Sequence, residues 1–448
     1  MLLSGGSGRR LWPLSNDARA KQFLKMMRGP DGGLESMVQR VWRQLGDAGL
    51  TKDCMIVTNP LQTDIIGRQL GGGVPLLVEP ESRDTFPAIA LAASYLRDVR
   101  GAGPNETVVA LPVDPYADDA FFRLVKDLEP LLSRSSAELG LIGATPTYNS
   151  TKYGYIVPAP ADGQRDYVKA AAFYEKPSER VAEELIANKG AMWNCGVFAF
   201  RLEYMIRQLR DRGLPVEYDR LAADYRRLSR TSFDVEVAET CRNIAVLPYE
   251  GSWKDLGTWN TLTEEMDVSR IGKGRLSHDS RNTHVINELH IPVSVLGLSN
   301  IVVAVSPDGI LVSDKEASPR LKEVLDSGQS PMYVEYAWGT SRVVDYDLLA
   351  EDNEVVTKRM TVTAGRTTDF ALSPAREKIW TFLSGTGEVE LEGRPLAVRQ
   401  GSVVRIPPRA KHGIHAFEDV ELVEIQTGRP LNEGDIQRMA YSWGSAVI

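Results

Sequence analysis

A glycine-rich loop near the N-terminus carries the sharpest chemical pattern of this sequence. The segment Ser4-Gly5-Gly6-Ser7-Gly8-Arg9-Arg10-Leu11 follows a very short apolar start. Glycines let a backbone wrap closely around a ligand and point successive N–H groups at it, which is how proteins cradle oxyanions. The loop arginines and the later Lys21 add fixed cations beside it. The pattern therefore favours polyphosphate binding over a plain surface turn, the alternative for any glycine-rich loop.

Two named phosphate-binding motifs do not match this loop. A P-loop would end in Gly-Lys-Ser or Gly-Lys-Thr, and a dinucleotide fingerprint would place a glycine where Leu11 stands. The sequence therefore excludes a P-loop ATPase and a Rossmann dehydrogenase.

The composition is that of a globular chain with more than one core. At roughly 150 residues per domain, 448 residues suggest about three domains. The 43% hydrophobic and 25% charged residues exclude disordered and low-complexity classes. A net charge of -8 argues against nucleic acid or an anionic membrane as partner.

Cysteine usage and the absence of targeting signals indicate a cytoplasmic protein. Only three cysteines occur and no Cys-x-x-Cys pair, which excludes a disulfide framework and a thiolate zinc site. No stretch approaches the ~18 apolar residues of a membrane helix, and the start lacks the regions of a signal peptide.

Three different patterns of apolar residues along the chain indicate which elements position the loop. Up to residue 262, short apolar runs alternate with helical patterns, which is typical of a mainly parallel sheet with helices on its faces. Residues 263–335 read as a small β-rich linker domain, and 336–448 as a β-barrel or sandwich of short alternating strands. The segments behind this prediction are helices over 34–45 and 87–96 and strands at Cys54–Val57, Pro75–Val78, Thr107–Leu111, Val293–Val295, Ile301–Val305, Gly309–Val312, Val355–Val362, Gly387–Leu391, Val403–Ile406 and Val420–Ile425.

Seven segments, in order along the chain, resemble one enzyme family. The glycine loop, continued by Trp12–Ser15 and Lys21–Leu24, is similar to the signature loop of nucleoside-diphosphate-sugar pyrophosphorylases, and most of all to that of mannose-1-phosphate guanylyltransferases. The six further matching segments are Glu79–Ile89, Leu111–Asp114, Tyr153–Ile156, Tyr174–Pro177, Trp193–Phe198 and Ser252–Trp259. The resemblance continues to the C-terminal region, in the arrangement of the long enzymes that pair guanylyltransferase with phosphomannose isomerase. It implies an α/β fold with a Rossmann-like nucleotidyltransferase (GT-A-like) mixed-sheet domain, a small β-rich linker domain and a C-terminal cupin-like β-barrel.

The reaction that the resemblance implies joins GTP and mannose 1-phosphate to give GDP-mannose and pyrophosphate. Because the attacking phosphate and the α-phosphorus are both surrounded by negative charge, catalysis must rest on in-line positioning and on neutralising the leaving pyrophosphate. Arg10 and Lys21 match the family's loop cations, and Asp114 and Asp255 match its two magnesium ligands. Asp114 also follows a predicted strand, where an open α/β sheet places its ligand crevice. Two carboxylates with phosphate oxygens and waters suit Mg²⁺ as the cofactor.

The resemblance also implies two binding regions. Nucleotide binding is expected of Ser4, Gly5, Gly6, Ser7, Gly8, Arg9, Glu79 and Arg83. On the sugar side, Lys176 is expected to contact the phosphate, Glu175 and Asn194 to hydrogen-bond hydroxyls, and Gly154 to let the hexose approach closely. Trp193, Phe198 and Trp259 are expected to be core residues rather than ligand platforms.

The C-terminal region lacks the metal ligands that the bifunctional enzymes carry there. Where they have Gln-x-His followed by Glu-His, this chain has Ala371, Ser373, Lys378 and Ile379. Residues 365–380 contain no histidine, and the Lys378 ammonium would repel a divalent cation. The single downstream His412 does not make a metal site. We therefore expect an inactive isomerase domain, whose barrel could still serve dimerisation or bind a regulatory sugar. A homodimer is therefore one of the oligomeric states that the sequence allows.

Three functional hypotheses stay open. The leading one is a guanylyltransferase without isomerase activity. The second is the same chemistry on another sugar 1-phosphate or nucleotide, because Arg9, Asp84 and Phe86 depart from the usual family pattern. The third is a non-catalytic regulatory subunit, supported by Arg9, by Ala20 and Lys152 in place of the family's Pro and Gly, and by the lost barrel ligands. Retention of all the main charged residues, which are Arg10, Lys21, Asp114, Lys176 and Asp255, favours an enzyme.

The strand before the loop is expected to be short. Only Met1–Leu3 precede Ser4, so either that strand is brief or the start codon is misassigned.

Overall fold

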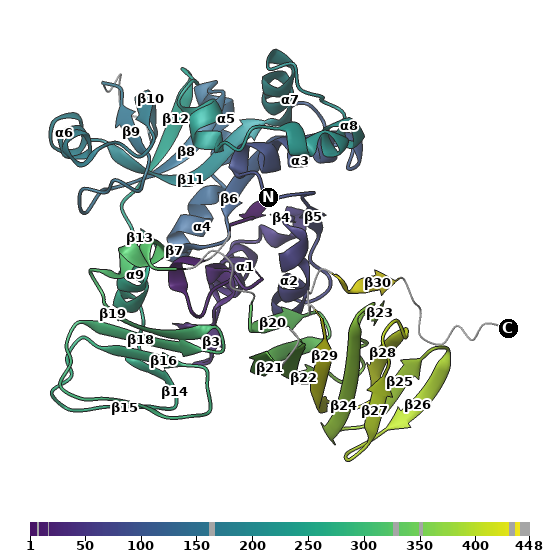
Figure 1. Cartoon of the computed structure of the whole chain (residues 1–448). Coiled ribbons are helices and arrows are strands. Elements are labelled where there is room, and N and C mark those ends of the chain that lie inside the picture. The colour runs from purple at the N-terminus through teal and green to yellow at the C-terminus, as the bar shows by residue number, and fades with distance from the viewer. Residues whose placement is uncertain are drawn as a thin grey trace. The chain divides into compact units, whose positions relative to one another are not determined.

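The fold is described from a computed structural model, which covers residues 1–6, 9–16, 18–160, 166–325, 331–348, 353–429 and 435–439 (Figure 1). The chain divides into two compact units. The first comprises Met1–Arg10, Ala20–Thr63 and Gln69–Asp267, and the second comprises Leu11–Arg19, Asp64–Arg68 and Val268–Ile448. The linker and barrel regions both fall in the second unit, and the three-domain division stays a prediction.

A nine-stranded mixed sheet forms the centre of the first unit (Figure 1). Its strand order is β5-β4-β1-β6-β11-β8-β12-β10-β9. Strands β5, β4, β1 and β6 run parallel, β11 runs antiparallel to both of its neighbours β6 and β8, and β8 and β12 run parallel again. The bounds are β1 Leu2–Ser4, β4 Ile56–Thr58, β5 Leu76–Val78, β6 Thr107–Pro112, β8 Leu139–Ala144, β9 Tyr155–Pro158, β10 Val168–Tyr174, β11 Met192–Arg201 and β12 Ile244–Tyr249. The predicted α/β class with a mixed sheet is confirmed.

Nine α-helices accompany the described strands. They are α1 Met37–Asp47, α2 Thr63–Leu70, α3 Thr85–Asp98, α4 Asp119–Val125, α5 Leu128–Ser135, α6 Glu179–Lys189, α7 Leu202–Asp211, α8 Tyr218–Ala223 and α9 Trp259–Glu264. Helix α3 is buried along most of its length, from Phe86 to Ser94, and its side chains join the core of the first unit.

The helix predicted from residue 34 begins three residues later. Ser36 caps α1, because its hydroxyl accepts a bond from the Gln39 backbone while the Gln39 side chain bonds back to the Ser36 backbone. Leu34 lies instead in the short strand β3 (Leu34–Glu35), which pairs with β2 (Met27–Arg28). The helix predicted from the apolar periodicity is therefore confirmed in its interior, but its predicted start is wrong, because the capping box at Ser36 sets the first residue of the helix.

A separate two-stranded sheet brings two distant segments of the first unit together. Strand β6 ends at Pro112, and Asp114 leads into β7 (Pro115–Ala117). Strand β7 pairs antiparallel with β13 (Trp253–Asp255), in a register that sets Asp255 opposite Pro115. Asp255 thus lies beside the chain that carries Asp114.

The second unit contains two kinds of β-structure. A four-stranded sheet of order β14-β16-β18-β19 and the pair β15-β17 are largely parallel. Their bounds are β14 Arg270–Gly272, β15 Gly274–Leu276, β16 His284–Asn287, β17 Val293–Val295, β18 Ile301–Ser306 and β19 Gly309–Asp314. The segment 11–19 is held in this unit by the Arg19 guanidinium, which donates to both carboxylate oxygens of Glu288 at 3.0 and 2.7 Å.

Two antiparallel sheets form the barrel, with Trp380, Phe382, Ile414 and Leu422 in its core. Their orders are β20-β21-β22-β29-β24-β27 and β26-β25-β28-β23-β30. The bounds are β20 Tyr333–Tyr336, β21 Gly339–Leu348, β22 Glu354–Val362, β23 Phe370–Leu372, β24 Arg376–Ser384, β25 Gly387–Leu391, β26 Arg394–Val398, β27 Val403–Ile406, β28 His412–Ala416, β29 Val420–Gly428 and β30 Gln437–Met439. The strands predicted in this region are confirmed to within two or three residues at their ends.

No helix within the described ranges is long and apolar enough to cross a lipid bilayer.

Gly339, at the start of β21, leaves no room for a side chain. A Cβ there would lie 1.8 Å from the Thr361 carbonyl oxygen, which is backbone and cannot move aside. We expect Gly339→Ala to lower the free energy of unfolding by about 1–3 kcal/mol. Gly67→Ala is the matched control, because nothing lies within 4 Å of its Cβ position in α2 and alanine favours a helix. Urea unfolding of both variants tests this, and equal midpoints would contradict it.

Candidate functional site

A pocket in the first unit gathers residues from segments far apart in the sequence. It lies where β6 ends, is open to solvent and has a cavity volume of about 220 Å³. The residues predicted for the site that line it are Lys21, Asp114, Gly154, Glu175, Asn194 and Asp255. The structure therefore brings Lys21, both predicted metal ligands and three of the four predicted sugar-binding residues to one pocket, whereas Arg10 and Lys176 are not among its lining residues.

The Lys21 ammonium bridges the two predicted metal ligands. Its Nζ lies 2.7 Å from Asp114 Oδ2 and 2.7 Å from Asp255 Oδ1. Lys21 stands in a one-turn 3-10 helix (Lys21–Phe23) that is anchored by the buried side chains of Gln22 and Phe23. One cation is thus shared by two carboxylates from different ends of the sequence.

The charges of this cluster stabilise one another. Burial lowers the pKa of Lys21, but Asp114 and Asp255 outweigh burial and leave that pKa well above its ordinary value. Burial raises the pKa of Asp255, but Lys21, followed by Arg10 and Lys152, holds it below its usual range. At neutral pH Lys21 is therefore an ammonium and Asp255 a carboxylate.

This donor set fits a magnesium ion that is shared with a phosphate ligand. The described residues contain no group of three or more His, Cys, Asp or Glu side chains that could hold a metal alone. Two carboxylates that reach one cation are what Mg²⁺ uses when phosphates and waters supply its remaining ligands.

Arg10 lies near Asp255 of this cluster. A Cβ at Gly257 would stand 3.5 Å from the Arg10 guanidinium and 3.2 Å from Asp255 Oδ2. Gly257 is thus the neighbour of both groups, and a side chain there would crowd them. Lys152, to which no binding role was assigned from sequence, also lines the pocket and adds a further positive charge.

The far end of the pocket carries polar groups suited to hydroxyls. A Cβ at Gly154 would lie 2.7 Å from Glu175 Oε2, so only glycine leaves the Glu175 carboxylate in this position. Glu175 pairs with the Lys176 ammonium at 2.5 Å. Lys176 is 60% exposed, stands at φ 45° and is not among the residues that line the pocket.

Asp234 belongs to this end of the pocket and was not found from sequence. Asn194 Nδ2 donates a 2.7 Å hydrogen bond to its Oδ1. Burial, and then the nearby Glu175, raises the pKa of Asp234 to about 7. Asp234 begins a five-residue π-helix (Asp234–Ala238), an element that often marks functional sites. Its sequence context, Ser-Phe-Asp-Val, carries no motif, so only the fold reveals it.

The glycine loop is held by a buried amide network. Ser4 Oγ donates to Gln62 Oε1 at 3.1 Å, and Gln62 Nε2 donates to the Gly6 carbonyl at 3.2 Å. A Cβ at Gly5 would lie 3.1 Å from Glu79 Oε1. Burial raises the pKa of Glu79 to about 7, although a hydrogen bond from Tyr225 opposes that rise. Of the other predicted nucleotide-binding residues, Ser7, Gly8 and the side chain of Arg9 lie outside the described residues.

Arg83 is not among the residues that line this pocket. Its guanidinium donates to the Leu228 carbonyl at 2.7 Å and lies 3.6 Å from Glu81. Glu79 lies beside Gly5, but neither the described loop residues nor Glu79 line this pocket, as is also true of Arg83.

Aromatic side chains wall the pocket. Tyr153 and Trp253 line it, with ring centroids 5.2 Å apart in an edge-to-face contact. The expectation that Trp193, Phe198 and Trp259 are core residues is confirmed, since each is at most 2% exposed.

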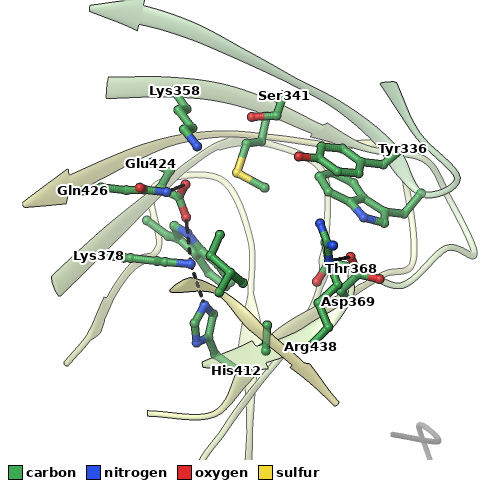
Figure 2. A pocket seen from close by; sticks show the side chains of 15 residues that line it. Tyr336, Ser341, Lys358, Thr368, Asp369, Lys378, His412, Glu424, Gln426 and Arg438 are labelled. Atoms are coloured by element: carbon green, nitrogen blue, oxygen red, sulfur yellow. Dashed lines mark hydrogen bonds and ion pairs between the residues drawn. The ribbon is translucent and has the colours of Figure 1, made fainter. Parts of the chain in front are cut away.

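A second pocket lies inside the barrel of the second unit (Figure 2). Of the four positions where metal ligands were sought, Ala371 and Lys378 line it. Ile379 points to the opposite face of β24 from Lys378, because side chains alternate along a strand. His412 and Glu424 line the pocket beside Lys378, and the Nε2 nitrogen of His412 lies 3.0 Å from the Lys378 ammonium.

The chain is similar to known proteins over its full length. Residues 1–269 match the nucleotidyl transferase family, and residues 329–441 match the family described as mannose-6-phosphate isomerase C-terminal. The xanthan biosynthesis protein XanB of Xanthomonas campestris pv. campestris (strain B100) is 30% identical over 480 residues, which cover 99% of this chain and 98% of that protein. A mannose-1-phosphate guanylyltransferase of Salmonella muenchen is 28% identical over 478 residues, covering 98% of this chain and 97% of that protein.

A solved structure agrees with this assignment. The crystal structure of a Thermus thermophilus protein, described as a mannose-1-phosphate geranyltransferase, is 29% identical with a TM-score of 0.61. It covers 72% of this chain and 96% of that one. The chain therefore belongs to the nucleotidyl transferase family, among the mannose-1-phosphate guanylyltransferases that carry a C-terminal domain of the mannose-6-phosphate isomerase type.

Proposed function

We propose that this chain converts GTP and mannose 1-phosphate to GDP-mannose and pyrophosphate with Mg²⁺, and that it has no phosphomannose isomerase activity. The observation that carries the first part is the single pocket that joins the Lys21–Asp114–Asp255 cluster to Gly154, Glu175 and Asn194. The relatives named mannose-1-phosphate guanylyltransferase support mannose and guanine as the specific partners.

The reaction requires charge neutralisation rather than covalent help from the protein. A phosphate oxygen of the sugar phosphate attacks the α-phosphorus, and the bond from that phosphorus to the bridging β-phosphate oxygen breaks. Pyrophosphate leaves with the electron pair, so negative charge grows on it. Fixed cations aimed at that charge lower the barrier because they need no reorganisation. Lys21 and Arg10 are the residues proposed for this role.

Asp114 and Asp255 are the residues that would hold magnesium. When bound, the ion would offset the negative charge of the nucleotide phosphates during nucleotidyl transfer. The chain's own part is to keep both carboxylates together beforehand, which the Lys21 ammonium does.

The sugar is proposed to bind at the Gly154 end. The Glu175 and Asp234 carboxyl groups offer hydrogen-bond acceptors, and the Asn194 side chain offers an amide. The hydrogen bond between Asn194 and Asp234 fixes the positions of those two side chains. A hydroxyl of the wrong stereochemistry would leave one of these groups unpaired, which is how such a site discriminates.

Nucleotidyl transfer is expected to depend on the carboxylate cluster. Pyrophosphate release should be fastest with GTP and mannose 1-phosphate in a screen that includes ATP, UTP, CTP, dTTP and other sugar 1-phosphates. Asp114→Asn should lower kcat/KM by about 100-fold or more, and chelation of Mg²⁺ should stop the reaction.

Asp127→Asn is the control for this prediction, because Asp127 is exposed and forms no cap bond to α5. A fully active Asp114→Asn enzyme would refute the magnesium role, and a wild-type chain inactive with every pair would favour a regulatory subunit.

Asp234 is expected to act on the sugar and not on the nucleotide. Asp234→Ala removes the acceptor that orients Asn194, so KM for mannose 1-phosphate should rise about 5- to 10-fold with KM for GTP unchanged. Asp234→Asn keeps an acceptor oxygen and should be milder. Initial rates with each substrate varied in turn measure this, and an equal rise in both KM values would contradict it.

The barrel is expected to be inactive as an isomerase. Purified protein that shows guanylyltransferase activity should not convert mannose 6-phosphate to fructose 6-phosphate with Mn²⁺, Co²⁺ or Zn²⁺ added, because Lys378 stands among the barrel's ligating groups. A coupled fructose 6-phosphate assay tests this, and conversion that requires added metal would refute it.

A further inference from the structure

The barrel pocket is organised around a buried lysine. Figure 2 shows the Lys378 side chain between Glu424 and His412. Its Nζ lies 3.0 Å from His412 Nε2 and 3.8 Å from Glu424 Oε2. Lys378 is 6% exposed, an unusual burial for a residue type that is almost always at the surface.

His412 directs its lone pair at this ammonium. Its Nδ1 lies 2.8 Å from the Ala410 carbonyl oxygen, an acceptor only, so Nδ1 carries the proton. Nε2 therefore accepts the hydrogen bond from Lys378. Burial, and then Lys378, lowers the pKa of His412 to about 4, so the imidazole is neutral at physiological pH. The nitrogen that a metal would need is already used.

Glu424 has both of its oxygens engaged. Trp380 Nε1 donates to Oε2 at 2.7 Å, and Gln426 Nε2 donates to Oε1 at 2.5 Å. The Gln426 amide is held in turn by a 2.8 Å bond from Arg376 to its oxygen. Burial raises the pKa of Glu424, but Lys378 and then Lys358 bring it down to about 2. The carboxylate is thus charged and buried, and Lys378 is the cation with the largest effect on it.

The remaining charges of the pocket also disfavour a metal ion. Arg438 pairs with Asp369 at 2.9 Å, and Lys358 lines the same pocket. Three cationic side chains therefore face two carboxylates, and a divalent ion would add to an existing surplus of positive charge.

We propose that the Lys378 ammonium is a built-in cation that takes the place of a divalent metal in the barrel, where it contacts the two buried groups with metal-binding chemistry, His412 and Glu424. Removing a metal from such a site normally leaves a buried carboxylate without a counter-charge. Here the Lys378 side chain supplies most of that charge permanently, and Lys358 adds to it. The barrel is therefore metal-independent, and its fold depends on Lys378. This inference rests on the proposed loss of isomerase activity, but its tests use stability and metal binding, which are independent of guanylyl transfer.

Thermal unfolding of the full chain is the first test. Lys378→Gln should lower the Tm by roughly 5–10 °C, because it removes the larger of the two positive charges that stabilise the buried Glu424 carboxylate. Lys411→Gln, a neighbouring exposed lysine on the barrel, should not change it. EDTA should leave the wild-type Tm unchanged. If Lys378→Gln does not fold, the double variant Lys378→Met with Glu424→Met, which removes both charges, should fold. An unchanged Tm in Lys378→Gln, or a wild-type Tm lowered by EDTA, would overturn the proposal.

Metal binding is the second test. In equilibrium dialysis with Co²⁺ and no nucleotide, Lys378→Glu should bind about one more ion per chain than wild type, since it creates a third ligand beside His412 and Glu424. Adding His412→Gln should remove that ion. Wild-type binding of Co²⁺ that is lost in His412→Gln alone would show that the native barrel holds a metal and would overturn the proposal.

Discussion

Repulsion between two carboxylates is the constraint that organises the first unit. Asp114 and Asp255 must converge to serve a phosphate site, and like charges at close range oppose this. The Lys21 ammonium offsets the repulsion, 2.7 Å from each. For these three side chains to meet, the short helix that begins at Lys21, the end of β6 and strand β13 must converge. The parallel strand order β4-β1-β6 and the β7–β13 pairing meet that requirement.

Both units place a lysine between two acceptors, with different chemical consequences. Lys21 faces carboxylates on an open pocket, so phosphates and metal can compete for every partner it has. Lys378 faces a neutral imidazole and a carboxylate whose two oxygens already accept hydrogen bonds from Trp380 and Gln426. The same arrangement is therefore a ligand site in one unit and a structural contact in the other.

Sequence reasoning reached the residues that sit in contiguous motifs. Lys21, Asp114 and Asp255 could be predicted because each lies in a recognisable segment, and the strands of the barrel because apolar residues alternate there. Asp234 could not, since a π-helix brings it to the pocket and no local pattern marks it. Nor could the pattern show that the Ser4 hydroxyl is engaged by Gln62, because that contact joins residues 58 positions apart. Contacts between side chains that are distant in the sequence are set only when the chain packs, so sequence patterns do not predict them.

The short β7–β13 sheet limits how the gene can change. Its register of only three residue pairs sets Asp255 opposite Pro115, next to Asp114. Gaining or losing one codon in either strand would shift the pairing by one residue and turn the carboxylate to the other face. Length variation among descendants of this gene should therefore accumulate in the connections on either side, because an insertion or deletion within these two tripeptides would displace Asp255.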